Sequence, residues 1–137
     1  MSRKVLIVDD SAAMVLGLAL HLRAAGYGAD SATDGDAGLK AVTENRPDVI
    51  LLDVNMPNMD GFEFIRRLGS LRDCAHIPVI LLSGDTDGVL RNEARIVGVK
   101  HVLSKIHDIS QLVAAIEDVT RSQPENAGAP NDTSLDG

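Results

Sequence analysis

Short apolar runs alternate along this chain with longer stretches in which apolar residues recur at helical spacing. The clearest runs cover residues 5–8, 49–52 and 77–82. Apolar runs this short, without polar alternation, are typical of strands buried on both faces of a parallel sheet. Residues 99–103 predict a further strand. A weaker one at 27–31 contains Gly28, which favours an edge position.

Helical patterns follow each of these runs. Gly26 and Gly98 are helix stop signals, and Pro47 limits the second helix because the residue before a proline avoids helical geometry. The predicted helices cover residues 11–25, 34–45, 62–68, 87–97 and 109–121. Five βα units therefore predict a single α/β domain, doubly wound, with a parallel five-stranded sheet and helices on both faces.

The composition changes after residue 121. Residues 122–137 are polar and rich in Pro, Asn and Ser, with three acidic residues and almost nothing apolar to bury. Such a segment favours disorder. We therefore expect a folded domain over residues 1–121 and a disordered polar tail or linker over 122–137.

Composition excludes several classes of function. The net charge is −7 and aromatic residues make up only 2%, which argues against direct nucleic-acid binding, because that requires clustered cations or stacking rings. No stretch approaches the length of a membrane span. Cys74 is the only cysteine and no signal peptide is evident, so a cytoplasmic location is expected.

Polar residues follow four of the apolar runs. Asp9 and Asp10 follow the first, Asp53 the third, Ser83 the fourth and Lys105 comes shortly after the fifth. In a parallel sheet the carboxyl ends of the strands share one edge, which is where open α/β folds bind ligands. Each residue alone has an ordinary explanation as a cap, turn or surface charge, but their combination indicates a site.

The chemistry of these five residues is consistent with a site for phosphoryl transfer. Three carboxylates repel one another and raise their pKa values unless a cation enters, and oxygen ligands at an exposed edge suit Mg²⁺. With Lys105, the cation would balance the charge and allow a phosphoryl group to approach. Asp53 would be the nucleophile that forms an acyl phosphate, while Lys105 and the Ser83 hydroxyl hold the phosphoryl oxygens.

These residues, together with Met-Pro-Asn-Met-Asp-Gly at 56–61, resemble the receiver domains of bacterial response regulators across about residues 3–121. The resemblance implies a flavodoxin-like (βα)5 fold with strand order 2-1-3-4-5. It also implies phosphoryl transfer to Asp53 from a histidine kinase or phosphotransfer protein, with Mg²⁺. Such a domain signals by conformational change to a downstream protein or a fused output domain, and is not a conventional enzyme.

The resemblance further implies a set of metal ligands. The Asp10 and Asp53 side chains and the backbone carbonyl of Asn55 would hold Mg²⁺, and Asp9 would act through a metal-bound water.

Two positions depart from the family pattern. Ile106 follows Lys105, where the family usually has a proline, so this peptide bond is expected to be trans. Val102 stands three residues before the lysine, where the family usually carries an aromatic side chain that turns inward. Because valine cannot swing a ring, we expect a muted or rerouted switch.

The first predicted helix is apolar nearly all round over residues 14–22, whereas a surface helix normally shows a polar stripe. The extra apolar residues either lie under loops or the tail, or form an exposed patch. Such a patch would dock a kinase or phosphotransfer helix, or would form a homodimer.

Other functions remain as alternatives. One is a receiver-like interaction module with weak or no phosphorylation-dependent switching, which Val102 and Ile106 favour. Another is an aspartyl-phosphate phosphohydrolase, but Asn55 occupies the position where such an enzyme needs a second aspartate. A nucleotide or flavin binder is disfavoured because no glycine-rich phosphate loop is present.

Overall fold

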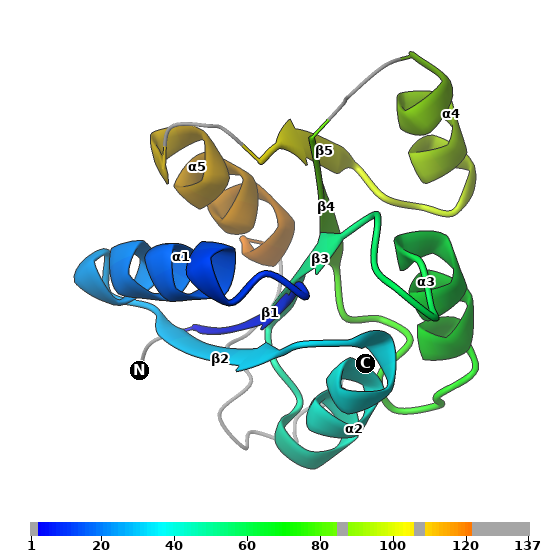
Figure 1. Ribbon diagram of the computed structural model, residues 1–137, viewed down its shortest axis with the longest axis horizontal. Coiled ribbons are helices and arrows are strands. Elements are labelled where there is room, and N and C mark those ends of the chain that lie inside the picture. Colours follow the sequence, from blue (N-terminus) through cyan, green and yellow to red (C-terminus); the bar gives the residue numbers. More distant parts are fainter. Residues whose placement is uncertain (1–2, 85–87, 106–108, 122–137) are drawn as a thin grey trace.

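The computed structural model describes residues 3–84, 88–105 and 109–121, and within them five strands alternate with five helices (Figure 1). The strands are β1 Lys4–Val8, β2 Gly28–Ala32, β3 Val49–Asp53, β4 Val79–Ser83 and β5 His101–Ser104. The helices are α1 Ala12–Ala24, α2 Gly35–Asn45, α3 Gly61–Gly69, α4 Gly88–Ile96 and α5 Ile109–Thr120. None of these helices is long and apolar enough to span a membrane.

The strands form one parallel sheet in the order β2-β1-β3-β4-β5, which confirms the predicted fold and the edge position of β2. The register aligns the ends of neighbouring strands. Val8 of β1 pairs with Leu52 of β3, so Asp53 is one position further along the same edge. Asp53 in turn pairs with Leu82 of β4. The residues that follow the strands are therefore brought to one level at the carboxyl edge.

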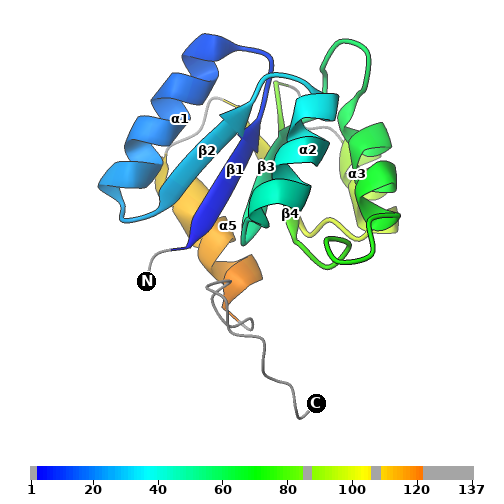
Figure 2. The same ribbon diagram turned by 90° about the horizontal axis from the view of Figure 1, so that it is seen from below.

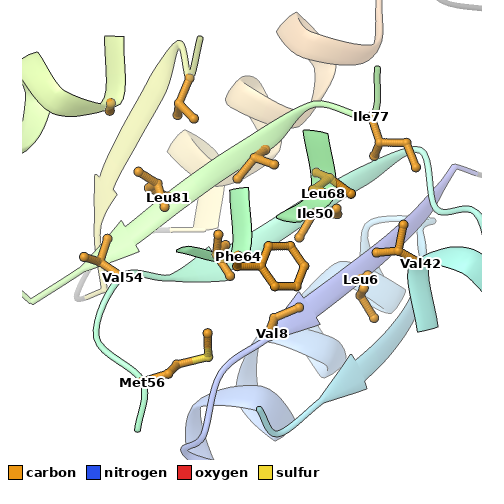
Figure 3. Packing of buried hydrophobic residues seen from close by; sticks show 14 of the residues in the cluster. Leu6, Val8, Val42, Ile50, Val54, Met56, Phe64, Leu68, Ile77 and Leu81 are labelled. Carbon is orange, nitrogen blue, oxygen red and sulfur yellow. The ribbon is translucent and has the colours of Figure 1, made fainter. Parts of the chain in front are cut away.

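Helices cover both faces of the sheet (Figures 1 and 2). Helices α1 and α5 pack on one face, where their buried residues join Ile7, Leu51 and Ile80 in a common core cluster. Helices α2, α3 and α4 pack on the other, where Phe64 lies among aliphatic side chains (Figure 3). Strands β3 and β4 are buried along their whole length, as their continuous apolar runs predict.

Two strands begin two residues later than the sequence predicts. Strand β4 begins at Val79 rather than residue 77, although the Pro78 carbonyl already accepts a hydrogen bond from Ile50 N at 3.0 Å. Strand β5 begins at His101 rather than residue 99. Val99 N donates instead to Ala94 O at 2.8 Å, around Gly98 at φ +90°. Val99 thus belongs to the turn that ends α4, which is a glycine-dependent helix stop.

The start of α3 positions the loop that follows β3. A Cβ on Gly61 would lie 3.0 Å from Val54 Cα and 3.1 Å from Asp53 O. Only glycine permits so close an approach of helix to strand. Asp60 caps the same helix by accepting from Glu63 N at 2.9 Å. The loop over residues 54–60 is therefore held against the end of β3, beside Asp53.

Candidate functional site

The carboxyl edge of the sheet brings together four of the predicted site residues. Lys105 Nζ lies 3.1 Å from Asp9 Oδ2 and 3.3 Å from Asp53 Oδ2, so one ammonium group bridges two carboxylates. Carboxylate oxygens of Asp9, Asp10 and Asp53 all lie within 4.8 Å of one another. Three strands separated by long stretches of sequence contribute to this cluster.

Backbone amides orient the two buried carboxylates. Asp9 N donates to Ala32 O at 3.1 Å, which continues the β1–β2 pairing beyond the strand. Asp9 Oδ1 accepts from Ser11 N at 2.9 Å. Asp53 Oδ1 accepts from Asn55 N at 3.2 Å. In each case one oxygen is held by the backbone while Oδ2 points toward Lys105.

Ser83 and Lys105 are tied to each other through the main chain. Lys105 N donates to Ser83 O at 2.8 Å, and Ser83 pairs in register with Ser104. Ser83 is buried and is one residue beyond Leu82, the partner of Asp53 across the β3–β4 ladder. Ser83 therefore lies at the same edge as the carboxylates.

Burial controls the electrostatics of the cluster. Asp9 and Asp53 are only 1% and 3% exposed, whereas Asp10 is exposed. Burial raises the pKa of Asp53, and the charge of Asp9 adds to this effect, while the Asn55 amide and the Lys105 ammonium partly oppose it. For Lys105, burial alone lowers the pKa, but Asp9 and Asp53 outweigh it and the net pKa is raised. Lys105 therefore stays charged between two acids.

The cluster fits a divalent cation. Asp9 Oδ2 is buried, and among the residues that the structure describes its one partner is the Lys105 ammonium group at 3.1 Å. An under-satisfied buried carboxylate oxygen next to the exposed Asp10 offers hard oxygen ligands, which Mg²⁺ prefers. The backbone of Asn55 follows directly, held to Asp53 by its own amide.

Other sequence predictions have mixed outcomes. Val102 is buried at 5% exposure within the core cluster on the α2, α3 and α4 face. Ile106 and residues 122–137 lie outside the described residues. Sequence reasoning missed a hydrogen bond between His101 Nε2 and Asp118 Oδ2 at 2.8 Å, which joins β5 to α5. Two residues 17 positions apart give no sequence signal for such a contact.

Comparison with known proteins identifies the class. The chain matches the response regulator receiver domain family over residues 5–117. It is 33% identical over 132 residues to the transcriptional regulatory protein PrrA of Mycobacterium tuberculosis, covering 96% of this chain and 56% of PrrA. It is 39% identical over 124 residues to the response regulator PleD of Caulobacter vibrioides, covering 88% of this chain and 27% of PleD.

A solved structure supports the same family assignment. The chemotaxis protein CheY4 of Vibrio cholerae superposes with a TM-score of 0.82 at 33% identity, covering 87% of this chain and 99% of that protein. The chain therefore belongs to the response regulator receiver domain family, whose role is that of a phosphoryl-accepting signalling module. It spans little more than half of PrrA and about a quarter of PleD.

The raised pKa of Asp53 predicts a pH-dependent cost to stability. A carboxyl whose pKa is higher in the folded than in the unfolded state binds its proton more tightly when folded. Its contribution to the free energy of unfolding therefore falls as the pH rises from the unfolded-state pKa to the folded-state pKa. In the absence of divalent cations, we expect Asp53→Asn to raise the free energy of unfolding at pH 7. The gain should shrink as pH falls toward the ordinary aspartate value of about 3.9.

Urea denaturation of both proteins across this pH range measures the effect. Asp30→Asn is the matched control, because Asp30 is exposed on the edge strand β2, and it should change the free energy of unfolding by less than about 0.5 kcal/mol. An Asp53→Asn variant that is no more stable than wild type at pH 7 would contradict the prediction.

Proposed function

We propose that Asp53 is the phosphoacceptor and that residues 1–121 form the receiver, with residues 122–137 as a polar tail or linker. The phosphoryl group comes from a histidine kinase or phosphotransfer protein in the cytoplasm, and Mg²⁺ is the cofactor. The observation that carries this proposal is the position of Lys105 Nζ, within 3.3 Å of both buried carboxylates, Asp9 and Asp53.

The transfer itself is a displacement at phosphorus. An Asp53 carboxylate oxygen attacks the phosphorus, the bond to the donor histidine nitrogen breaks, and the electron pair remains on that nitrogen. Lys105, already 3.3 Å from the Asp53 carboxylate, neutralises negative charge on the incoming phosphoryl oxygens. The Ser83 hydroxyl, at the neighbouring strand end, donates to one of these oxygens.

The proposed metal ligands are the Asp10 and Asp53 side chains and the Asn55 backbone carbonyl, with Asp9 acting through a water. When bound, Mg²⁺ supplies positive charge that offsets the repulsion between the carboxylates and the phosphoryl group. The crowding of three carboxylates within 4.8 Å supports this set. Asp9 remains the residue that holds Lys105 in place, through the 3.1 Å ion pair.

Incubation with Mg²⁺ and a small phosphodonor tests this assignment. We expect intact mass spectrometry to detect one added phosphoryl group on the wild-type protein and on Asp30→Asn, and none on Asp53→Asn. Chelation of the metal should abolish the modification in all three proteins. A phosphorylated Asp53→Asn protein of native fold would disprove the choice of acceptor.

The exposed face of α1 supports a docking role. Leu16 and Leu20 are 61% and 57% exposed, one helical turn apart, and the helix begins next to Asp10, capped by Ser11. Neighbours four residues apart share one helix face. We propose that this face receives the helix that carries the donor histidine; self-association through the same face is the alternative.

A double substitution, Leu16→Glu with Leu20→Glu, separates docking from chemistry. We expect phosphoryl transfer from a phosphorylated histidine phosphotransfer domain to slow at least tenfold, while labelling by a small phosphodonor stays unchanged. Val89→Glu with Ile96→Glu, which alters exposed apolar residues of α4, is the matched control. Loss of a dimer in size-exclusion chromatography, with transfer intact, would instead support self-association.

Val102 supports a second candidate, a receiver whose phosphorylation changes its structure only weakly. Val102 is already buried at 5% exposure, in the same core cluster as Leu90 and Ala94 of α4. A branched side chain in this position has few alternative rotamers. The output, whether a downstream protein or a domain fused in a longer chain, would then read a small displacement.

Methyl NMR spectra before and after phosphorylation test this expectation. We expect large shifts for Leu82 and Leu103, near the acceptor edge, and small ones for Val102 and Val99. Spectra of Asp53→Asn with the same phosphodonor give the baseline. A large phosphorylation-dependent repacking around Val102 would show that the switch is neither muted nor rerouted.

A further inference from the structure

Two adjoining cavities lie away from the carboxylate cluster. The first, the basal cavity, has a volume of about 420 Å³ and lies between the starts of β4 and β5 and the last turns of α3, α4 and α5. The second, the α4–β5 groove, has a volume of about 440 Å³ and is lined by Arg91, Arg95, Gly98, Val99, Lys100 and Val102. The two cavities share the residues 98–100.

The α4–β5 groove is cationic, although the chain as a whole carries −7. Arg91 and Arg95 are four residues apart and so share one side of α4, and Lys100 lies across from them before β5. Glu93, two residues from each arginine, lies on roughly the opposite side of the helix. The floor, Val99 and Val102, is apolar and buried.

The basal cavity connects this groove with the end of the folded domain. Asp118 and Val119, in the last turn of α5, line it together with Lys100. Helix α5 ends at the edge where β1 begins, and Arg3 donates to the Thr120 carbonyl at 3.1 Å (Figure 2). A chain that leaves α5 at Arg121 therefore starts at the rim of the basal cavity.

The chain beyond α5 has the complementary composition. Residues 122–137 contain Glu125, Asp132 and Asp136, no Lys, Arg or His, and one large apolar residue, Leu135. The eleven residues from 122 to 132 can span roughly 36 Å when extended, which is about the diameter of a domain of this size. Length and charge both suit contact with the groove.

We propose that residues 122–137 bind in cis to the α4–β5 groove, with their carboxylates against Arg91, Arg95 and Lys100. A tethered segment is present at an effective concentration on the order of millimolar, so individually weak ion pairs suffice. The bound segment covers the side of β5 that carries Val102 and competes with any partner that uses this face. The contact does not require phosphorylation of Asp53.

Paramagnetic NMR of the full chain tests the proposal directly. A nitroxide is attached to Ser134→Cys in a Cys74→Ala background, since Cys74 is the only native cysteine. At an ionic strength of about 0.01 M, where charges act over about 30 Å, we expect the amides of Arg95, Gly98 and Lys100 to lose most of their intensity. At about 1 M salt, where the screening length is about 3 Å, the intensity should return.

Charge variants provide matched comparisons. Arg91→Gln with Arg95→Gln should abolish the broadening, whereas Lys40→Gln with Arg72→Gln, an equal charge change at exposed residues outside both cavities, should leave it intact. Without any label, Glu125→Gln, Asp132→Asn and Asp136→Asn together should shift the groove amides of an otherwise native protein. This second measurement holds even if the cysteine replacement perturbs the fold.

Two outcomes would overturn the proposal. Equal broadening in the Arg91/Arg95 variant and in its control would mean that the segment has no preference for the groove. In a second experiment, nitroxide-tagged protein is added to isotope-labelled protein that carries no tag. If the labelled amides are broadened as strongly as they are within one chain, the segment binds a second copy.

Discussion

The bridge of Lys105 between Asp9 and Asp53 is the interaction on which the site depends. Both carboxylates are almost completely buried, and two buried charges of like sign are unfavourable unless a cation lies between them. The ammonium group at 3.1 and 3.3 Å provides that cation. Burial nevertheless still raises the pKa of Asp53, so the folded protein retains an acid that benefits from further positive charge.

The sheet accounts for how such an arrangement can persist. Strands β3 and β4 are buried throughout and packed on both faces by helices, which gives the strand ends a rigid base. Backbone amides at Ser11 and Asn55 then hold one oxygen of each carboxylate. Hydrophobic burial elsewhere in the domain thus offsets the unfavourable repulsion between the two buried carboxylates. The site also has hydrogen-bonding capacity left for a ligand.

Charge is distributed unevenly over the domain. The acidic cluster lies at the carboxyl edge of the sheet, while Arg91, Arg95 and Lys100 surround a groove beside β5 and near its start. Strand β5 connects the two regions, since Lys105 follows its end and Val102 lies in its interior. A ligand at either place would therefore act on the same short strand, which His101 also ties to α5 through Asp118.

The sequence by itself determined the βα alternation and the identity of the acidic edge, because apolar runs and strand-end positions are local features whose convergence follows from parallel pairing. The order of the strands came from the resemblance to receiver domains. Only the tertiary structure decided that Lys105 lies between Asp9 and Asp53, that β5 begins at His101 because Val99 closes α4, and that His101 meets Asp118. Those contacts depend on the lengths of the side chains and on the positions in which the helices pack against the sheet. Such distances arise from packing of the whole chain, and no local pattern encodes them.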